Sequence, residues 1–169
     1  MNETYKYPEN YLLFNSPLEV GLRILVLLSQ DSTTIFDIDR LVIFDYFILH
    51  ANDVDNEQIN LHPSLPLRSS EIIIRRKLIS EGLDLLVSKG LVEKVYTDKG
   101  IYYRANKLTA MFIDLLKSDY YKDLNSLCYW VTNKFKSFTT PELNSIVNEN
   151  IQLWGGEFEF ESLVRGNYE

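Results

Sequence analysis

The sequence is poor in cysteine and lacks the features of a secretory leader. Cys128 is the only cysteine among 169 residues, which excludes an internal disulfide and a cysteine-based zinc site. The first eleven residues, MNETYKYPENY, have neither the charged region nor the apolar region of a signal peptide. We therefore expect a cytoplasmic protein in which the single thiol is a small core side chain.

Long apolar runs and an excess of positive charge are also missing. The longest strongly apolar run, Ile24 to Leu28, is far too short to cross a bilayer, so we expect no membrane contact. Seventeen Lys and Arg residues stand against twenty-four Asp and Glu residues, which gives a formal charge of -7. Long-range electrostatics then repel phosphate backbones unless the few cations cluster. This balance argues against a protein that acts by binding DNA alone.

Motifs that carry catalysis are absent. The sequence contains no glycine-rich phosphate loop, no G-x-S-x-G elbow, no H-E-x-x-H motif and no paired carboxylates in a polar setting. Two histidines, His50 and His62, do not have the spacing of metal ligands. We expect neither an enzyme nor a protein that holds a cofactor or a metal.

A long amphipathic stretch followed by two β-prone stretches is the main feature that the sequence does contain. Residues 91–96 and 101–104 are rich in β-branched and aromatic side chains, and the turn between them ends at Gly100, where a positive φ is wanted. A long helix that leads into a hairpin is the core of a winged helix. We expect a mainly α protein with a small β-hairpin, in which a winged-helix core is followed by C-terminal helices. Apolar residues of the long helix, which should end at Gly90, recur at intervals of three and four: Ile72, Ile79, Leu83 and Leu86 on one line, and Ile74, Leu78 and Leu85 on a second.

Two further helices should precede the long one. Ser16 followed by Pro17 and Glu19 has the pattern of a capping box with proline at the first helical position. The helix that begins there is almost wholly apolar to residue 28, so we expect it at the centre of the core. A second apolar helix should cover about residues 37–50.

Two charged residues interrupt the apolar faces of these helices. Asp45 lies on the buried face of the second helix, and Arg75 lies within the apolar arc of the long one. A carboxylate in such a place must be paired or must change its pKa. We expect a buried structural ion pair between Asp45 and Arg75 rather than a catalytic or ligand-binding site, with Glu19 and Asp39 as alternative partners of Arg75.

The remaining chain should form a surface loop and three more helices. Residues 51–68 are expected to be the loop, because they contain two prolines and several acids. Asn106 can cap a helix with an amphipathic stripe, a second helix follows Asp119, and a third runs from Thr140 to about Trp154. We divide the chain into an N-terminal arm (1–13), a winged-helix core (14–105), a C-terminal helical part with an extended end (106–163) and a tail (164–169). The amphipathic stripe consists of Leu108, Met111, Phe112 and Leu115.

The end of the C-terminal part is the candidate surface for a protein partner. Residues 157–161 alternate acid and aromatic, so a strand there would place two phenylalanines on one side and three carboxylates on the other. Such a strand can dock on its own domain or add to the sheet edge of a partner, and we expect the partner contact. The candidate partner-binding residues are Trp154, Phe158, Phe160 and Leu163.

The outward face of the long helix argues against base reading. A recognition helix should present Arg, Lys, Asn or Gln to base edges, whereas this face includes Glu81 and Asp84. A winged-helix transcriptional regulator is therefore the alternative to a protein-interaction module. Weak contacts with the DNA backbone are expected at most from four residues: Arg76, Lys94, Lys99 and Arg104.

A series of short motifs along the chain resembles a known family. The motifs are Phe14-Asn15-Ser16-Pro17-Leu18-Glu19 with Gly21 and Arg23; Asp39-Arg40-Leu41-Val42 to Asp45-Tyr46; Leu61-His62-Pro63 to Arg68-Ser69; Arg75-Arg76; Gly90-Leu91-Val92-Glu93; and Trp154-Gly155 with Phe158. Their order resembles the second type of middle component in bacterial ABC-three-component systems, over about residues 14 to 163.

The resemblance implies a function that the residues alone do not show. Such systems are similar to the Lamassu type of anti-phage and anti-plasmid defence, in which a small middle component joins an SMC-like ABC ATPase and an effector such as a nuclease. The ATPase would detect or grip foreign DNA, and the middle component would help to couple that event to the effector. The resemblance implies no catalytic residues in this chain.

Overall fold

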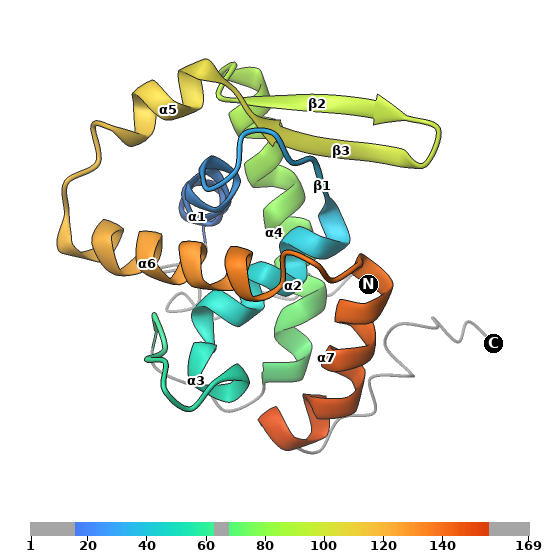
Figure 1. Cartoon of the computed structure of the whole chain (residues 1–169). Helices are drawn as coiled ribbons and strands as arrows, with labels where there is room; N and C mark the ends of the chain where they lie inside the picture. Colours follow the sequence, from blue (N-terminus) through green and yellow to red (C-terminus); the bar gives the residue numbers. More distant parts are fainter. Residues whose placement is uncertain (1–15, 63–67, 156–169) are drawn as a thin grey trace, which may run out of the picture.

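The computed structural model describes residues 16–62 and 68–155, with side chains described at 16–62 and 75–150. This part of the chain is mainly helical and has one small antiparallel sheet (Figure 1). The expected arm (1–13) and tail (164–169) lie outside it. The elements are α1 (Pro17–Ser29), β1 (Phe36–Asp37), α2 (Ile38–Leu49), α3 (Ala51–Val54), α4 (Arg68–Ser88), β2 (Val92–Thr97), β3 (Gly100–Ala105), α5 (Lys107–Ile113), α6 (Asp119–Lys134) and α7 (Thr140–Gly155).

The sheet is built on the expected hairpin. Strands β2 and β3 pair antiparallel, with Tyr96 opposite Ile101, and Gly100 in the turn has a φ of 136°. Its positive φ is a conformation that glycine adopts without steric cost. Strand β1, which the sequence did not predict, adds to the other side of β3 and gives the order β1-β3-β2. The hairpin extends well beyond the helices in Figure 1.

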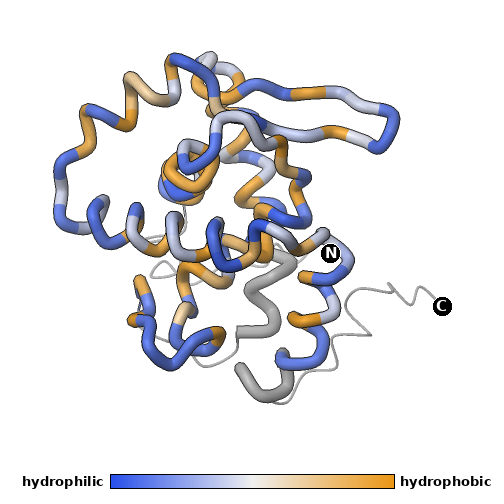
Figure 2. Tube along the Cα trace, viewed as in Figure 1, coloured by the Kyte–Doolittle hydropathy of each residue, from blue (hydrophilic) through white to orange (hydrophobic). Residues whose placement is uncertain are grey.

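Helix α1 occupies the centre of the core, as expected. From Val20 to Leu28 only Leu22 is not fully buried, and α4, α5 and α6 all contact the helix. In Figure 2 its hydrophobic residues lie in the middle of the surrounding elements. None of the helices in the described ranges combines the length and apolar character needed to cross a membrane.

The C-terminal helices pack directly on α2. Arg40 donates to the carbonyl oxygens of Phe138 (2.6 Å) and Phe135 (2.9 Å), and the hydroxyl of Thr140 donates to Asp37 (2.8 Å). The side chain of Asp37 also caps α2 by accepting from the amide of Arg40 (2.7 Å). These bonds attach the connection between α6 and α7 to the first turn of α2.

Two helix starts are confirmed in atomic detail. The hydroxyl of Ser16 accepts from the amide of Glu19 (3.3 Å), and the Glu19 carboxylate accepts from the amide of Ser16 (3.1 Å), which completes the capping box. Asn106 caps α5 by accepting from the amides of Leu108 (2.9 Å) and Thr109 (3.1 Å).

Two segments differ from what their sequence patterns suggested. The segment predicted as a loop after residue 50 begins with the short helix α3, and Ala51 is buried. The predicted stripe of α5 does not face the core, since Leu108, Met111 and Leu115 are exposed and only Phe112 is partly buried. Bonds around Thr109 set the helix rotation: Thr109 accepts from the amide of Asn106 (2.8 Å) and donates to the carbonyl of Leu91. Thr109 and Ile113 therefore face inward.

Helices α1 and α4 approach each other closely at a pair of glycines. A Cβ added to Gly82 on α4 would lie 2.8 Å from the carbonyl oxygen of Pro17 and 2.9 Å from the Cα of Gly21 on α1. Both obstacles are backbone atoms, so no rotation of a side chain can relieve the contact. The packing of α1 against α4 therefore depends on the absence of a side chain at residue 82.

We predict that Gly82→Ala lowers the free energy of unfolding by about 1 to 3 kcal/mol, because overpacking forces the two helices apart. Alanine improves helix propensity by about 1 kcal/mol, so the steric cost must exceed that gain. Urea unfolding followed by circular dichroism measures the difference. Lys77→Ala on the exposed face of α4 is the control and should change stability by less than about 0.5 kcal/mol. A Gly82→Ala variant that is as stable as the wild type would contradict the prediction.

Candidate interaction surfaces

Three charged side chains meet in the core, from α1, α2 and α4. Asp45 accepts from Arg75 Nη1 at Oδ2 (2.9 Å), so the structure brings together the two residues expected to pair. Arg23 completes the cluster through Nε to Oδ1 (2.9 Å) and Nη2 to Oδ2 (3.3 Å). Asp45 is 0% exposed, Arg23 2% and Arg75 5%. We call these three residues the buried ion cluster.

The buried ion cluster keeps Asp45 charged. Burial by itself raises the pKa of the Asp45 carboxyl, but Arg23 and Arg75 outweigh that effect and lower it to about 2. Burial lowers the pKa of Arg23, whereas Asp45 raises it, and the net direction is upward. The three side chains are almost completely buried and neutralise one another, which is the arrangement expected of a structural ion cluster.

Sequence reasoning missed Arg23 as a member of this cluster. A signal was available, because Arg23 is the only cation in an apolar helix and a carboxylate has two oxygens to satisfy. The alternatives considered for Arg75 are used elsewhere. Glu19 belongs to the capping box of α1, and Asp39 pairs with Arg76 on the surface.

Most cations expected to touch DNA are paired with acids. Arg76 pairs with Asp39, Arg104 Nη2 lies 2.7 Å from Glu93, and Lys94 Nζ lies 4.0 Å from Asp84. Lys77 on the outer face of α4 lies 3.9 Å from Glu81. Lys99 in the hairpin turn forms no ion pair with any described residue. Over residues 75–105, the outer face of α4 and the hairpin therefore carry little unpaired positive charge toward phosphates.

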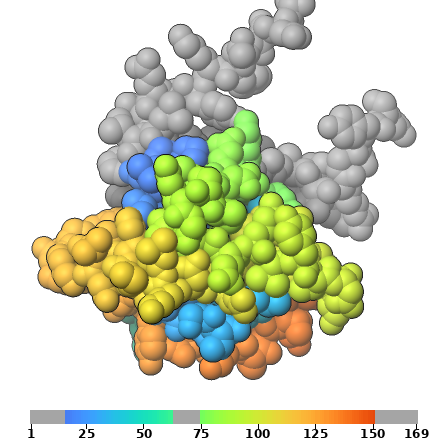
Figure 3. Space-filling model, turned by 90° about the horizontal axis from the view of Figure 1, so that it is seen from above, coloured from blue at the N-terminus to red at the C-terminus, as the bar shows by residue number. Residues whose placement is uncertain are grey.

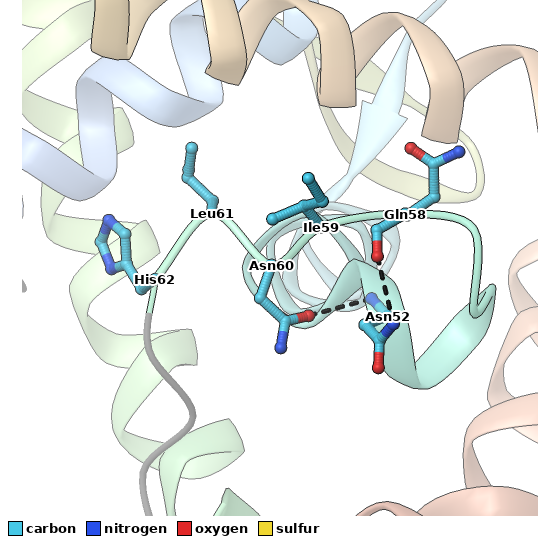
Figure 4. Close-up of a pocket in the computed structure, with 6 residues that line it drawn as sticks. All are labelled: Asn52, Gln58, Ile59, Asn60, Leu61 and His62. Atoms are coloured by element: carbon cyan, nitrogen blue, oxygen red, sulfur yellow. Dashed lines mark hydrogen bonds between the residues drawn. The ribbon is translucent and has the colours of Figure 1, made fainter.

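An open hollow lies beside α3. Its volume is about 480 Å³, and its lining is mostly aliphatic side chains and amides. The amide of Asn52 donates to Asn60 Oδ1 (2.9 Å), and the side chain of Asn52 donates to the carbonyl of Gln58 (3.2 Å), which folds the loop back on α3 (Figure 4). The hollow is therefore the space enclosed where this loop folds back on α3. The lining residues are Asn52, Gln58, Ile59, Asn60, Leu61 and His62.

A second hollow of about 260 Å³ lies next to the buried ion cluster. Glu19, Leu22 and Arg23 of α1 line one side, and Tyr120 and Leu124 of α6 line the other. At its edge His62 Nε2 lies 3.0 Å from the hydroxyl of Tyr120. Burial lowers the pKa of His62, so the neutral imidazole is favoured.

The single cysteine faces the core from α6. Cys128 is fully buried, and burial raises the pKa of its thiol well above the usual value. A buried thiol of raised pKa is a poor nucleophile. Cys128 is therefore a packing residue, as expected.

Exposed large apolar side chains form two groups of neighbours, on the hairpin and on α5, besides Leu18, Ile59, Tyr120 and Tyr129 elsewhere on the described surface. Tyr96 (71% exposed) and Ile101 face each other across the hairpin near its tip. The second group lies on α5 with the turn after it, which in Figure 3 forms a projecting shoulder (yellow). We call its exposed residues, Leu108, Met111 and Leu115, the α5 stripe.

The expected C-terminal partner surface lies largely outside the described residues. The backbone of Trp154 belongs to α7, but its side chain is not described. Phe158, Phe160 and Leu163 lie beyond residue 155. Their role as a partner surface stays a prediction.

Comparison with known families identifies the chain. The sequence profile of the family described as ABC-three component (ABC-3C) system Middle Component 2 matches residues 13–157. The chain belongs to this Middle Component 2 family. Searches of curated proteins and of solved structures found no match.

Membership in the Middle Component 2 family makes this chain part of a multi-component system. The exposed apolar groups on the hairpin and on α5 suit such a protein, because contiguous exposed apolar side chains commonly mark sites of protein contact. The sequence analysis did not predict that either group is exposed. The amphipathic pattern of α5 was recognised there, but its exposed orientation was not.

We predict that removing the anion of the buried ion cluster destabilises the fold strongly. Asp45→Ala leaves two buried arginines without their counter-charge and should cost about 3 to 5 kcal/mol in urea unfolding. Asp39→Ala removes the carboxylate of a half-exposed ion pair and should cost less than about 1 kcal/mol. Equal stability of the two variants would show that the buried ion cluster contributes nothing measurable.

The same cluster predicts an acid-labile contribution to stability. The pKa of Asp45 is about 2 in the folded protein, below its ordinary value of 3.8. Its contribution is therefore fully present above about pH 4 and is lost as the pH falls toward 2. Asp45→Asn should remove this part of the pH dependence, measured as the free energy of unfolding between pH 5 and pH 2.5.

We also predict that the isolated protein binds duplex DNA weakly and without sequence preference. The net charge is -7, and the cations of α4 and the hairpin are mostly neutralised by neighbouring acids. Fluorescence anisotropy with several labelled duplexes at physiological salt provides the measurement. Submicromolar and sequence-selective binding would contradict this prediction.

Proposed function

We propose that this chain is a non-catalytic adaptor that links an SMC-like ABC ATPase to an effector subunit, which we expect to be a nuclease. The observation that carries the proposal is the family match over residues 13–157. We place the complex in the cytoplasm and assign it to anti-phage or anti-plasmid defence of the Lamassu type. In this role the chain transmits the state of the DNA-engaged ATPase to the effector through protein contacts.

Features of the described surface support an adaptor over an enzyme. The described hollows have structural explanations or lie beside a buried ion cluster, and the only cysteine is a buried thiol of raised pKa. No group of three or more His, Cys, Asp or Glu residues in the described ranges is arranged to hold a metal. Exposed apolar side chains on the hairpin and on α5 instead offer contact area to other proteins.

We further infer that α1, β1, α2, α4 and the hairpin form a winged-helix core within residues 14–105, followed by a helical part. The support is the order of these elements and the way that β1 adds to the hairpin. The alternative function is a winged-helix transcriptional regulator. A basic face on α4 would favour it, but Arg76 and Lys77 are paired with acids there.

Co-expression with the subunits encoded beside this chain tests the adaptor function. We expect the tagged chain to recover both the ATPase and the effector, and we expect the effector to be lost from the ATPase when this chain is omitted. Assembly of the ATPase and effector without this chain would contradict a linking role. Selective binding to a DNA operator with no recovery of either subunit would favour the regulator.

The same assay includes the C-terminal residues expected to meet a partner. Phe158→Ser with Phe160→Ser should reduce recovery of one subunit at an unchanged melting temperature. A large fall in melting temperature with unchanged recovery would make these phenylalanines part of the chain's own core.

A further inference from the structure

The α5 stripe is an ordered line of apolar side chains that the rest of the described chain does not cover. Leu108 is 46% exposed, Met111 59% and Leu115 74%, although Leu and Met are usually buried. They recur at intervals of three and four residues, which places them on one helical face. Leu115 continues the line in the turn after α5, where its amide donates to the carbonyl of Phe112 (3.1 Å).

The opposite side of α5 is fully engaged, so the helix cannot rotate to bury the stripe. Thr109 and Ile113 face the core, and the Thr109 hydroxyl donates to the carbonyl of Leu91. Asn106 caps the helix and also donates to the carbonyl of Gly90 (2.9 Å). The stripe is therefore held outward by bonds on its inner side.

Unpaired lysines lie near both ends of the α5 stripe. Lys107 opens α5, Lys117 follows it, and the bond between Asn106 and Gly90 brings Lys89 to the start of the helix. None of the three forms an ion pair with a described residue, and all are exposed. Asp114 is the only acid between residues 105 and 118. This contrasts with α4 and the hairpin, where most cations are neutralised by acids.

We propose that the α5 stripe binds an amphipathic helix of a partner subunit, with apolar side chains at intervals of three and four and Asp or Glu residues on both flanks. This inference rests on the proposed function and specifies the chemistry of one contact in it. A line of side chains along a helix axis packs against the matching line of another helix. The thioether of Met111 adapts to irregular apolar surfaces. The three lysines select acidic flanks through electrostatic complementarity.

Other occupants fit the surface less well. DNA would bring phosphates to the lysines but would leave three apolar side chains without a partner. The chain's own C-terminal residues follow α7, which lies at the opposite end of the molecule from α5 (Figure 1). A second copy of the chain would oppose like charges if two α5 stripes met face to face.

Designed peptides test the inference without knowledge of the partner. The probe is a labelled helical peptide with leucines at intervals of three and four and glutamates on both flanks, and its control has lysines in place of those glutamates. We expect the full-length protein to bind the acidic peptide at least about tenfold more tightly, because like charges in the control oppose the lysines. Equal affinities, or preference for the lysine peptide, would overturn the proposal.

Variants of the protein locate the contact. The triple variant Leu108→Ser, Met111→Ser, Leu115→Ser should bind the acidic peptide at least about tenfold more weakly than the wild type does. The double variant Lys107→Glu, Lys117→Glu should prefer the lysine peptide over the acidic one. Tyr129→Ser, at an equally exposed site on α6, is the matched control and should bind like the wild type. All of these side chains are exposed, so melting temperatures should hold. Undiminished binding by the triple serine variant would overturn the proposal.

Three further measurements separate the other occupants. Failure of the full-length protein to bind the acidic peptide, with binding gained on removal of residues 156–169, would show that these residues occupy the stripe. Conversion of a dimer to a monomer by the triple serine variant, measured by sedimentation, would show a contact between copies. Loss of DNA binding in the lysine variants without loss of peptide binding would assign the surface to DNA. Each of these results would overturn the proposal.

Co-expression distinguishes failure of this inference from failure of the proposed function. If the wild type recovers the ATPase and effector and the triple serine variant recovers both equally, the adaptor function stands and the α5 contact is wrong. If the wild type recovers neither subunit, the adaptor function fails, and the peptide measurements still decide the chemistry of the stripe.

Discussion

The fold depends on one carboxylate that neutralises two arginines in the core. Asp45 on α2 binds Arg23 of α1 and Arg75 of α4, and all three side chains are almost completely removed from water. Burial of charges is costly, so the cluster is stable only when all three helices hold their positions together. If any one of these helices moved away from the other two, a charged side chain would be left without its counter-charge in an apolar setting. The buried ion cluster therefore specifies the mutual orientation of α1, α2 and α4, and the Gly21 and Gly82 contact sets the close distance between two of them.

The parts of this core that could be predicted from the sequence are those in which a charged residue interrupts an apolar helical face. Asp45 and Arg75 each interrupt an apolar helical face, and charge complementarity then pairs them. Arg23 was missed because a single ion pair between Asp45 and Arg75 already balances the charge, whereas in the structure the second carboxylate oxygen of Asp45 accepts from Arg23. Strand β1 has only two residues, too few for alternation to be visible. The orientation of α5 depends on hydrogen bonds from Thr109 and Asn106 to the segment after α4. The spacing of apolar residues within α5 cannot predict hydrogen bonds to a different segment.

The described surface separates its charges in a way that composition does not reveal. The net charge of -7 suggests a uniformly acidic exterior. Among the residues whose side chains are described, most surface cations of α4 and the hairpin are paired with acids, Lys99 being an exception, whereas Lys89, Lys107 and Lys117 are unpaired near the two ends of an apolar line. An acidic protein with one basic and apolar surface repels most acidic neighbours and attracts one that matches both features. The distribution of unpaired charge therefore carries more information about partners than the total charge does.

The position of α5 explains how such a surface can bind without being reorganised. A contact that must first order its own residues loses affinity to conformational entropy, whereas a rigid surface avoids that loss. The α5 helix is capped by Asn106, is bonded to the carbonyls of Gly90 and Leu91, and packs on α1 through its inner side. Gly90 and Leu91 join α4 directly to β2, and α4 carries Arg75 of the buried ion cluster. The α5 stripe is thus attached, through the segment after α4, to the helix that carries Arg75 of the buried ion cluster, which would hold its three apolar side chains in a fixed line for the proposed partner helix.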